Sequence, residues 1–251
     1  MQPSTPQLAS DALAALFARD PGAAAAQVQQ LAQGGDVQAQ AVYAQLLCEG
    51  KGVQRDPELG LHWYTVAATA GHLGAMNMAG RCLERGYGCN ADPALAAIWY
   101  KRAAGHGLDW ALYNLANLLA TGRGLPRDPE EAFALYLQAA RAGHAKSMNL
   151  VGRYLEEGLV VPADPDAALD WYRRSAQAGD FRGQASLASI LVQHGQLEQA
   201  CHWLGCAIAA GSPAFLQQLA TQLRAAPFPA LQALLPAIEQ RLAGLDPMAT
   251  G

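Results

Sequence analysis

A spacing of 36 residues recurs through the middle of the chain and limits the possible fold more than any other feature. Four Asp-Pro pairs have this spacing, and a tyrosine and a glycine follow each aspartate after eight and 15 residues. The aspartates are Asp56, Asp92, Asp128 and Asp164. A fixed period of this size is typical of repeat proteins, in which each unit buries its apolar face only against its neighbours.

Each repeat is predicted to contain two antiparallel helices. In the first full unit we expect helices over residues 37–48 and 57–69, joined by a glycine-containing turn at 50–53. Asp56 is suited to cap the second helix, because its carboxylate can accept hydrogen bonds from the first free backbone amides. Pro57 suits the first helical position, where no amide donor is needed. Gly71 then supplies the left-handed conformation that ends the unit.

The pattern on both helices predicts how they pack. Apolar residues on the first helix of each unit recur at i, i+4 and i+8, which indicates one buried stripe. Beside this stripe lies a column of small residues, Ala44, Gly80, Ala116 and Gly152, which implies that another helix approaches closely. We expect the residue before each repeated tyrosine to fill the space between the helices. These residues are Trp63, Trp99, Leu135 and Trp171.

The register predicts one continuous repeat domain over residues 1–251. A capping hairpin is expected at 6–35, four full repeats at 36–179, a shortened fifth repeat at 180–211 and a second capping hairpin at 212–245. The last hairpin is expected to end in a single helix that starts near Pro227 and reaches about Leu245. Residues 246–251 are predicted to be a disordered tail.

Charge and hydropathy exclude several kinds of partner. The 17 basic and 21 acidic residues are dispersed without a run of like charges, so no nucleic-acid partner is expected. No stretch approaches the roughly 20 apolar residues of a membrane span, so no membrane insertion is expected. The N-terminal segment lacks the basic leader and apolar core of a signal peptide, which favours a cytoplasmic location. The sequence leaves the oligomeric state open.

Neither cysteines nor histidines form a convincing reactive site in the sequence. Five cysteines, an odd number, favour free thiols over a disulfide framework, with Cys48 and Cys206 expected to be the most reactive. His202 and Cys206 are four residues apart, but two ligands alone do not predict a metal site. His72 and His144 each follow a closing glycine, where a polar turn residue suffices. We therefore predict no catalytic residue, no metal site and no cofactor, and no phosphate loop or nucleophile elbow is present.

One face of the first helices carries the composition of a binding surface. Aromatic, amide and guanidinium groups are concentrated there in the second to fourth units, whereas the first unit offers only Gln38, Ala41 and Gln45. The predicted partner-binding residues are Asn77, Arg81, Trp110, Tyr113, Asn117, Asn149 and Arg153. Aromatic rings provide contact area, amides pair with a peptide backbone and guanidiniums pair with carboxylates. The alternative is a solvated surface, in which Arg81 and Arg153 only pair with glutamates on their own helices.

Taken together, the repeated residues resemble the Sel-one-like repeat (SLR), a relative of the tetratricopeptide repeat. The resemblance covers residues from about 20 to 211 and includes the small residue of the first helix, the glycine turn, the Asp-Pro pair, the Trp-Tyr pair and the closing glycine. Three positions depart from this pattern, Gly60, Leu135 and Val160. The resemblance implies an all-α, right-handed solenoid, here of about six antiparallel helical hairpins, with the first helices lining a concave groove.

The same resemblance implies a non-enzymatic adaptor that binds a protein or peptide partner in that groove. The arginines among the predicted residues favour an acidic partner or a free carboxylate. One alternative is a dedicated regulatory subunit of a separately encoded enzyme, which the sequence does not separate from a general adaptor. A less favoured alternative is a cell-envelope hydrolase, for which an export signal and paired cysteines would be expected.

Overall fold

The computed structural model describes residues 13–245, and within this range every regular element is a helix. Residues 13–19 are helical and precede α2 (Pro21–Gln33). The further helices are α3 (Val37–Glu49), α4 (Pro57–Thr69), α5 (Leu73–Arg85), α6 (Pro93–Gly105), α7 (Asp109–Thr121), α8 (Pro129–Arg141), α9 (Ala145–Glu157), α10 (Pro165–Gln177), α11 (Phe181–Gln193), α12 (Leu197–Ala210), α13 (Pro213–Ala225), α14 (Pro229–Gln232) and α15 (Leu235–Leu245). The predicted tail and the start of the predicted N-terminal cap, 6–12, lie outside the described residues.

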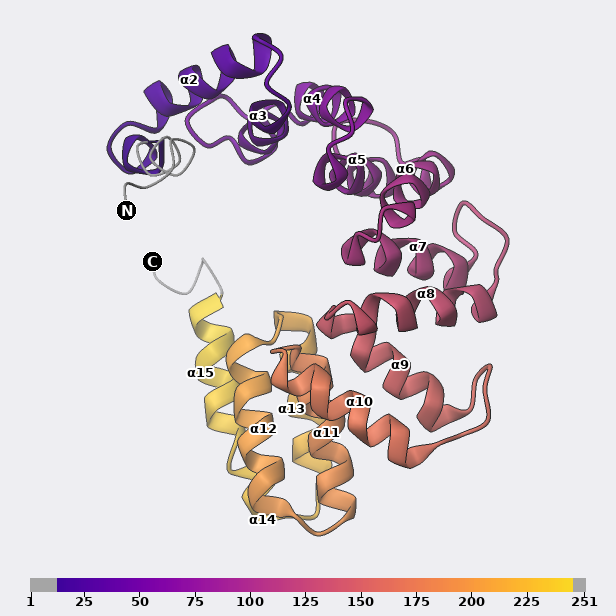
Figure 1. The fold of residues 1–251 in the computed structure, drawn as a ribbon. Coiled ribbons are helices and arrows are strands. Elements are labelled where there is room, and N and C mark those ends of the chain that lie inside the picture. Colours follow the sequence, from indigo (N-terminus) through magenta and orange to yellow (C-terminus); the bar gives the residue numbers. More distant parts are fainter. Residues whose placement is uncertain (1–12, 246–251) are drawn as a thin grey trace, which may run out of the picture. The chain divides into compact units, whose positions relative to one another are not determined.

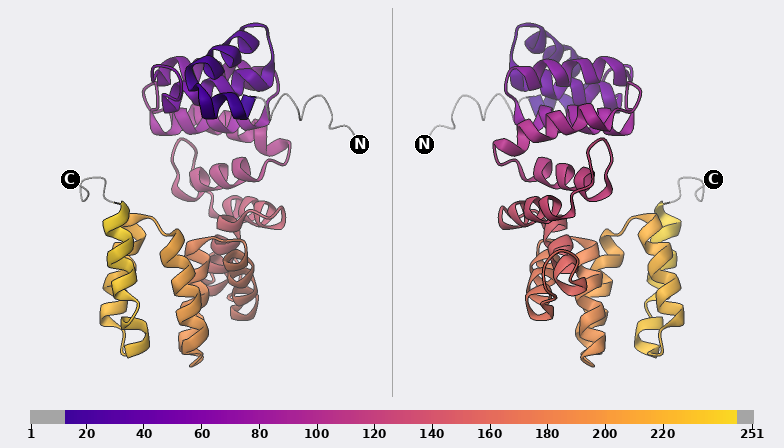
Figure 2. Two further views of the ribbon diagram at one scale, coloured as in Figure 1. Left: turned by 90° about the vertical axis from the view of Figure 1, so that its left-hand side faces the viewer. Right: turned by 90° about the vertical axis from the view of Figure 1, so that its right-hand side faces the viewer.

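The helices form two compact units, residues 1–128 and 129–251. In the first unit, each helix from α2 to α7 packs against the next one in the chain (Figure 1). In the second unit α8 to α12 pack in the same consecutive way, and α9 also contacts α11. At the end of this unit α15 lies against α12 and α13 (Figure 2). The chain is therefore all-α and built from successive helical hairpins, as the 36-residue period predicts.

The helix boundaries follow the capping residues of the sequence. Asp56 Oδ1 accepts a hydrogen bond from the backbone amide of Leu59 at 3.0 Å, and Asp92 and Asp164 make the corresponding bond on α6 and α10. Each of these helices begins with proline. Gly50, with φ of 71°, ends α3 in the left-handed conformation. The predicted helices at 37–48 and 57–69 are confirmed to within one residue.

The predicted core aromatic is the wrong member of each Trp-Tyr pair. Tyr100 is completely buried, and Tyr64, Tyr136 and Tyr172 are nearly so. The tryptophans that precede three of these tyrosines are only partly buried. Successive residues on a helix point about 100° apart, so both rings of a pair cannot enter the same core. The outer side of two tryptophans is covered instead by arginines, with Arg102 lying 4.8 Å from the Trp99 ring and Arg174 4.9 Å from the Trp171 ring.

The column of small residues makes room for these tyrosines. A Cβ atom on Gly80 would lie 2.6 Å from Cε1 of Tyr100, and one on Gly152 would lie 2.7 Å from Cε1 of Tyr172. Real Cβ atoms do not approach other atoms so closely. The predicted close approach of a neighbouring helix is therefore confirmed, with the tyrosine ring as the approaching group.

The C-terminal hairpin departs from the prediction in one respect. The single helix expected from Pro227 to Leu245 is divided into the four-residue α14 and the longer α15. Pro236 explains the interruption, because it has no amide hydrogen to donate to the carbonyl of Gln232 and its ring clashes with that carbonyl in a continuous helix. In the fifth repeat only residues 194–196 connect α11 to α12.

Candidate functional site

The first helices of successive repeats are joined by polar side chains. His72 caps α5, accepting a hydrogen bond from the Ala75 amide at Nδ1, while its Nε2 lies 2.8 Å from Oε1 of Gln38 on α3. Between α5 and α7, Nδ2 of Asn114 donates to Oδ1 of Asn77 at 2.8 Å. We call the surface formed by α3, α5 and α7 in the first unit the first-helix face. The structural role predicted for His72 at a helix start is confirmed.

The predicted binding residues of the first unit differ in their exposure. Asn77 is only 7% exposed and is bonded to Asn114, so it holds two helices together. Trp110 is 44% exposed and meets the Tyr113 ring edge to face, with 6.3 Å between centroids. Arg81 and Asn117 are partly buried. The first-helix face thus contains an exposed tryptophan and a partly covered guanidinium, while its asparagine at position 77 is structural.

The two remaining predicted residues belong to the second unit. Asn149 is 9% exposed, and its Oδ1 accepts a hydrogen bond from Oγ of Ser186 on α11 at 3.1 Å. This bond repeats the Asn77 arrangement two helix pairs further along the chain. Arg153 is exposed, and its Nε lies 3.9 Å from Oε1 of Glu157 on the same helix. Such a surface pair adds little stability and leaves the guanidinium accessible.

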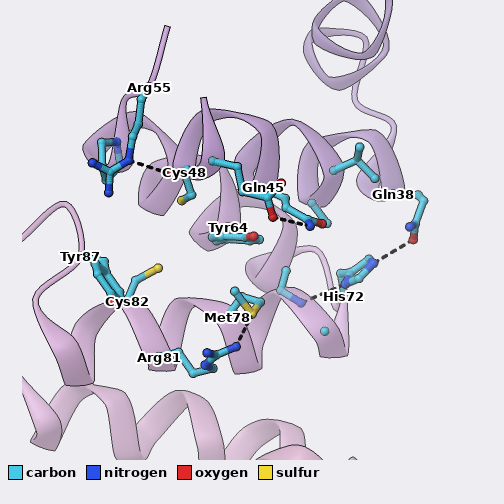
Figure 3. A pocket seen from close by; sticks show the side chains of 16 residues that line it. Gln38, Gln45, Cys48, Arg55, Tyr64, His72, Met78, Arg81, Cys82 and Tyr87 are labelled. Carbon is cyan, nitrogen blue, oxygen red and sulfur yellow. Dashed lines mark hydrogen bonds between the residues drawn. The ribbon is translucent and has the colours of Figure 1, made fainter. Parts of the chain in front are cut away.

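A pocket of about 640 Å³ lies on the first-helix face between α3, α4 and α5. Figure 3 shows that side chains from both first helices converge on it, with Tyr64 of α4 between them. Its polar lining includes Gln45, Cys48, Tyr64, His72, Arg81 and Cys82. The volume lies within the range of small-molecule and side-chain binding sites, roughly 300–1,000 Å³. A pocket of this size therefore lies between the first two full repeats.

Charges around this pocket are unevenly balanced. Arg81 points toward it and donates a hydrogen bond through Nη1 to the sulfur of Met78 at 3.5 Å, and none of the ion pairs within residues 13–245 involves it. Arg55 also lines the pocket and donates through Nε to the carbonyl of Cys48 at 3.1 Å. The one acidic lining residue, Glu49, accepts a hydrogen bond from Gln45 at 2.7 Å. Two guanidiniums thus face one carboxylate, which favours an anionic occupant.

The thiols and the tyrosine of the pocket influence one another. A hydrogen bond with the Cys82 thiol lowers the pKa of Cys48, with a further contribution from the charge of Arg55. The same thiol pair and its burial raise the pKa of Cys82. Burial also raises the pKa of Tyr64, so this hydroxyl keeps its proton and remains a hydrogen-bond donor at neutral pH.

Sequence reasoning found only part of this pocket. Arg81 was predicted as a binding residue, whereas Cys48, Tyr64 and Cys82 were not. The first full repeat was expected to contribute few groups to partner binding. The signal that could have revealed it lies in the register. The residues that correspond to Cys48 in the next three repeats are Glu84, Ala120 and Glu156, so a short thiol stands where two of the repeats have a longer carboxylate.

Within residues 13–245, no group of three or more histidine, cysteine or acidic side chains is arranged to hold a metal ion. In the same range, no helix has both the length and the apolar character to cross a membrane. All five cysteines are free thiols in this structure.

Its consecutive two-helix units place the chain in the class of α-helical repeat proteins. The Sel1 repeat model matches residues 37–72, 73–108, 111–144, 145–180 and 184–212, and the chain therefore belongs to the Sel1 repeat family. Proteins of this family generally mediate protein interactions and are typically non-catalytic scaffolds. A comparison with curated proteins gave no match.

Solved structures with the same fold include three bacterial proteins. A Sel1 repeat protein from Oxalobacter formigenes is 24% identical, with a TM-score of 0.76 over 95% of this chain and 98% of that one. The protective antigen c5321 of uropathogenic Escherichia coli is 25% identical, with a TM-score of 0.70 over 92% of this chain. This chain spans 52% of the length of c5321. The immunity protein Pa5087 from Pseudomonas aeruginosa is 15% identical, with a TM-score of 0.58 over 83% of this chain and 81% of that one.

Proposed function

We propose that this chain is a non-enzymatic scaffold that binds a protein or peptide partner through the first helices of its repeats. The observation that carries the proposal is the exposed side chain of Trp110, held edge to face by Tyr113 on α7. A large aromatic ring that is 44% exposed on a rigid helix is the kind of residue that contributes most to binding when a partner covers it. Because the helices are already packed, the protein loses little conformational entropy on binding.

The other predicted residues support this proposal in different ways. Arg81 and Arg153 favour an acidic segment or a free carboxylate, because Arg81 makes no ion pair within residues 13–245 and the guanidinium of Arg153 stays exposed beside Glu157 at 3.9 Å. Asn117, partly buried beside the aromatic pair, provides an amide for a peptide backbone. Asn77 and Asn149 are nearly buried and contribute by fixing the spacing of the first helices. No cofactor enters the proposal, and a cytoplasmic location stays a prediction from the sequence.

The test is a comparison of partner capture by the full chain and its variants. The partner is isolated on the immobilised parent protein and identified by mass spectrometry, and its affinity is then measured with purified components. Trp110→Ala is expected to weaken binding by about 2 kcal/mol or more, and Asn117→Ala by less. Arg174→Ala, on the second helix α10, is the control and is expected to bind like the parent. Equal binding by all three folded variants would contradict the proposal.

The identity of the captured partner also decides between a general adaptor and a regulatory subunit. A single enzyme recovered in stoichiometric amount, with altered activity in the complex, would assign the chain as its regulatory subunit. Several partners sharing one acidic motif would assign it as an adaptor.

A further inference from the structure

Two repeats of this chain contain a carboxylate held by the buried tyrosine of the same hairpin. In the second repeat, the hydroxyl of Tyr100 donates to Oε2 of Glu84 at 2.8 Å, and Nη1 of Arg123 donates to Oε1 of the same residue at 3.1 Å. In the fourth repeat, the hydroxyl of Tyr172 donates to Oε2 of Glu156 at 2.6 Å. In both cases the glutamate precedes its tyrosine by 16 residues.

The first repeat has the tyrosine but not the glutamate. Cys48 stands 16 residues before Tyr64, and its thiol is too short to take the place of a glutamate side chain. The space that a glutamate would occupy opens instead into the 640 Å³ pocket, which both residues line. Tyr64 remains protonated because burial raises its pKa, and its hydroxyl makes no hydrogen bond to another residue within 13–245.

Several neighbouring positions enlarge this space in the first repeat. Gly60 replaces the alanine found at positions 96, 132 and 168, and a Cβ atom there would lie 2.6 Å from Sγ of Cys48. Cys82 occupies the position of the larger Leu118 in the next repeat. The sulfur of Cys48 therefore sits against α4, away from where a longer side chain would extend, and the pocket remains accessible from solvent (Figure 3).

The first repeat lacks the arginine that pairs with Glu84 in the second repeat, and other arginines provide the positive charge. In the second repeat that cation is Arg123, whereas the corresponding position in the first repeat is Tyr87. Arg81 supplies a guanidinium here, and its charge is close enough to Tyr64 to oppose the rise in the tyrosine pKa. Arg55 adds a second guanidinium on the pocket wall. The donors needed for one carboxylate are thus present, while the one carboxylate in the pocket lining, Glu49, is hydrogen-bonded to Gln45.

We propose that the pocket between α3, α4 and α5 binds a glutamate side chain of a partner peptide, which takes the position that Glu84 and Glu156 occupy in their own repeats. Its carboxylate accepts hydrogen bonds from the hydroxyl of Tyr64 and the guanidinium of Arg81. The methylene groups of the glutamate lie against Ala41, Ala75 and Met78, which line the same pocket. A glutamate is assigned because it is the side chain that the chain itself places beside this tyrosine in its second and fourth repeats, whereas the third repeat has Ala120 at this position. The inference rests on the proposed function, since it names the chemistry of the partner.

The test uses NMR titration of the full chain with two acetylated and amidated pentapeptides. One has the sequence Ala-Ala-Glu-Ala-Ala, and the other has glutamine in place of glutamate. The glutamate peptide is expected to bind about tenfold more tightly or better, because a charged hydrogen-bonded group is replaced by a neutral one of the same shape. Shifted amide signals are expected in α3 and α5. Equal affinities for the two peptides, or no binding of either one, would overturn the proposal.

A variant that fills the pocket from within provides the sharpest control. Cys48→Glu is expected to pair with Tyr64 as Glu84 pairs with Tyr100, to keep the fold and to reduce affinity for the glutamate peptide at least about tenfold. Cys206→Glu, a partly buried cysteine of the second unit, is expected to bind the peptide like the parent. Unchanged binding by folded Cys48→Glu would show that the peptide lies elsewhere. If Cys48→Glu does not fold, Arg81→Gln tests the same contact from the accessible side, and unchanged affinity in that variant would equally overturn the proposal.

Two further comparisons separate the possible outcomes. An acetylated tetra-alanine with a free carboxyl terminus tests the other source of a carboxylate, and its binding in preference to the glutamate peptide would make the glutamate assignment wrong. Partner capture by the Cys48→Glu and Trp110→Ala variants separates this inference from the general function. Loss of capture in Trp110→Ala alone would leave the scaffold function standing and refute the pocket, whereas unchanged capture in both would contradict both proposals.

Discussion

At the residue scale, a buried tyrosine is the centre of each of the four full repeats. Tyr100 fills the space left by Gly80, and its hydroxyl is bonded to Glu84 at 2.8 Å. The neighbouring Trp99 is larger but lies at the border of the core, beneath Arg102. The tyrosine thus combines complete burial with a satisfied polar group, which a tryptophan at this position would not do.

Replacement of these two residues is therefore expected to have unequal effects. Tyr100→Ala should lower the free energy of unfolding by about 3–5 kcal/mol, because it removes buried contacts and leaves a cavity. Trp99→Ala should cost less, since part of the ring is already in contact with water. Urea denaturation of both variants measures the difference. A larger loss for Trp99→Ala would mean that the tryptophan carries the core.

The thiols provide a second prediction at this scale. Because the hydrogen bond from Cys82 lowers the pKa of Cys48, a larger fraction of Cys48 is thiolate near neutral pH than in an ordinary cysteine. Burial raises the pKa of Cys89, which serves as the comparison. Iodoacetamide labelling followed by mass spectrometry should modify Cys48 at least severalfold faster than Cys89 at pH 7, and the ratio should fall as the pH rises above both pKa values. Faster labelling of Cys89 would be the contradicting result.

At the scale of the helix, glycines have opposite roles according to their surroundings. Gly80 lies where α5 meets the Tyr100 ring, whereas a Cβ on Gly205, in the interior of α12, would meet no atom within 4 Å apart from its chain neighbours and the backbone of its own helix. A methyl group is thus blocked at the first position and accommodated at the second. Helix propensity alone would favour alanine at both.

Alanine at these positions should change stability in opposite directions. Gly80→Ala is expected to destabilise the protein by about 1–3 kcal/mol, because the added methyl group overlaps a buried ring. Gly205→Ala is expected to stabilise it by about 0.5–1 kcal/mol, because alanine restricts the unfolded chain and favours the helix. Thermal unfolding followed by circular dichroism distinguishes the two. Stabilisation by Gly80→Ala would show that the helices can separate at no cost.

At the scale of the whole molecule, the sequence predicted the helices better than the site. Asp-Pro pairs and closing glycines act locally, so the helix bounds followed from the residues themselves. The choice between Trp99 and Tyr100 depends on the direction from which the next helix approaches, which periodicity does not specify. The break before Pro236 was a local signal that was overlooked. The pocket depends on side-chain lengths at Cys48, Gly60 and Cys82, and these become informative only when superposed repeats show what each one replaces.

The division into two compact units leads to a prediction about how damage spreads. In repeat proteins stability is approximately a sum of the units and their nearest-neighbour interfaces, so a core defect should act mainly where it occurs. Tyr100→Ala lies in the first unit, and Tyr172→Ala lies in the second. Hydrogen exchange followed by mass spectrometry should show that Tyr100→Ala accelerates exchange chiefly in α5 and α6, whereas Tyr172→Ala does so in α9 and α10. The unsubstituted tyrosine's hairpin in each variant is the internal control, because its packing is unchanged. Equal acceleration throughout residues 13–245 in both variants would instead show that the two units open as one cooperative body.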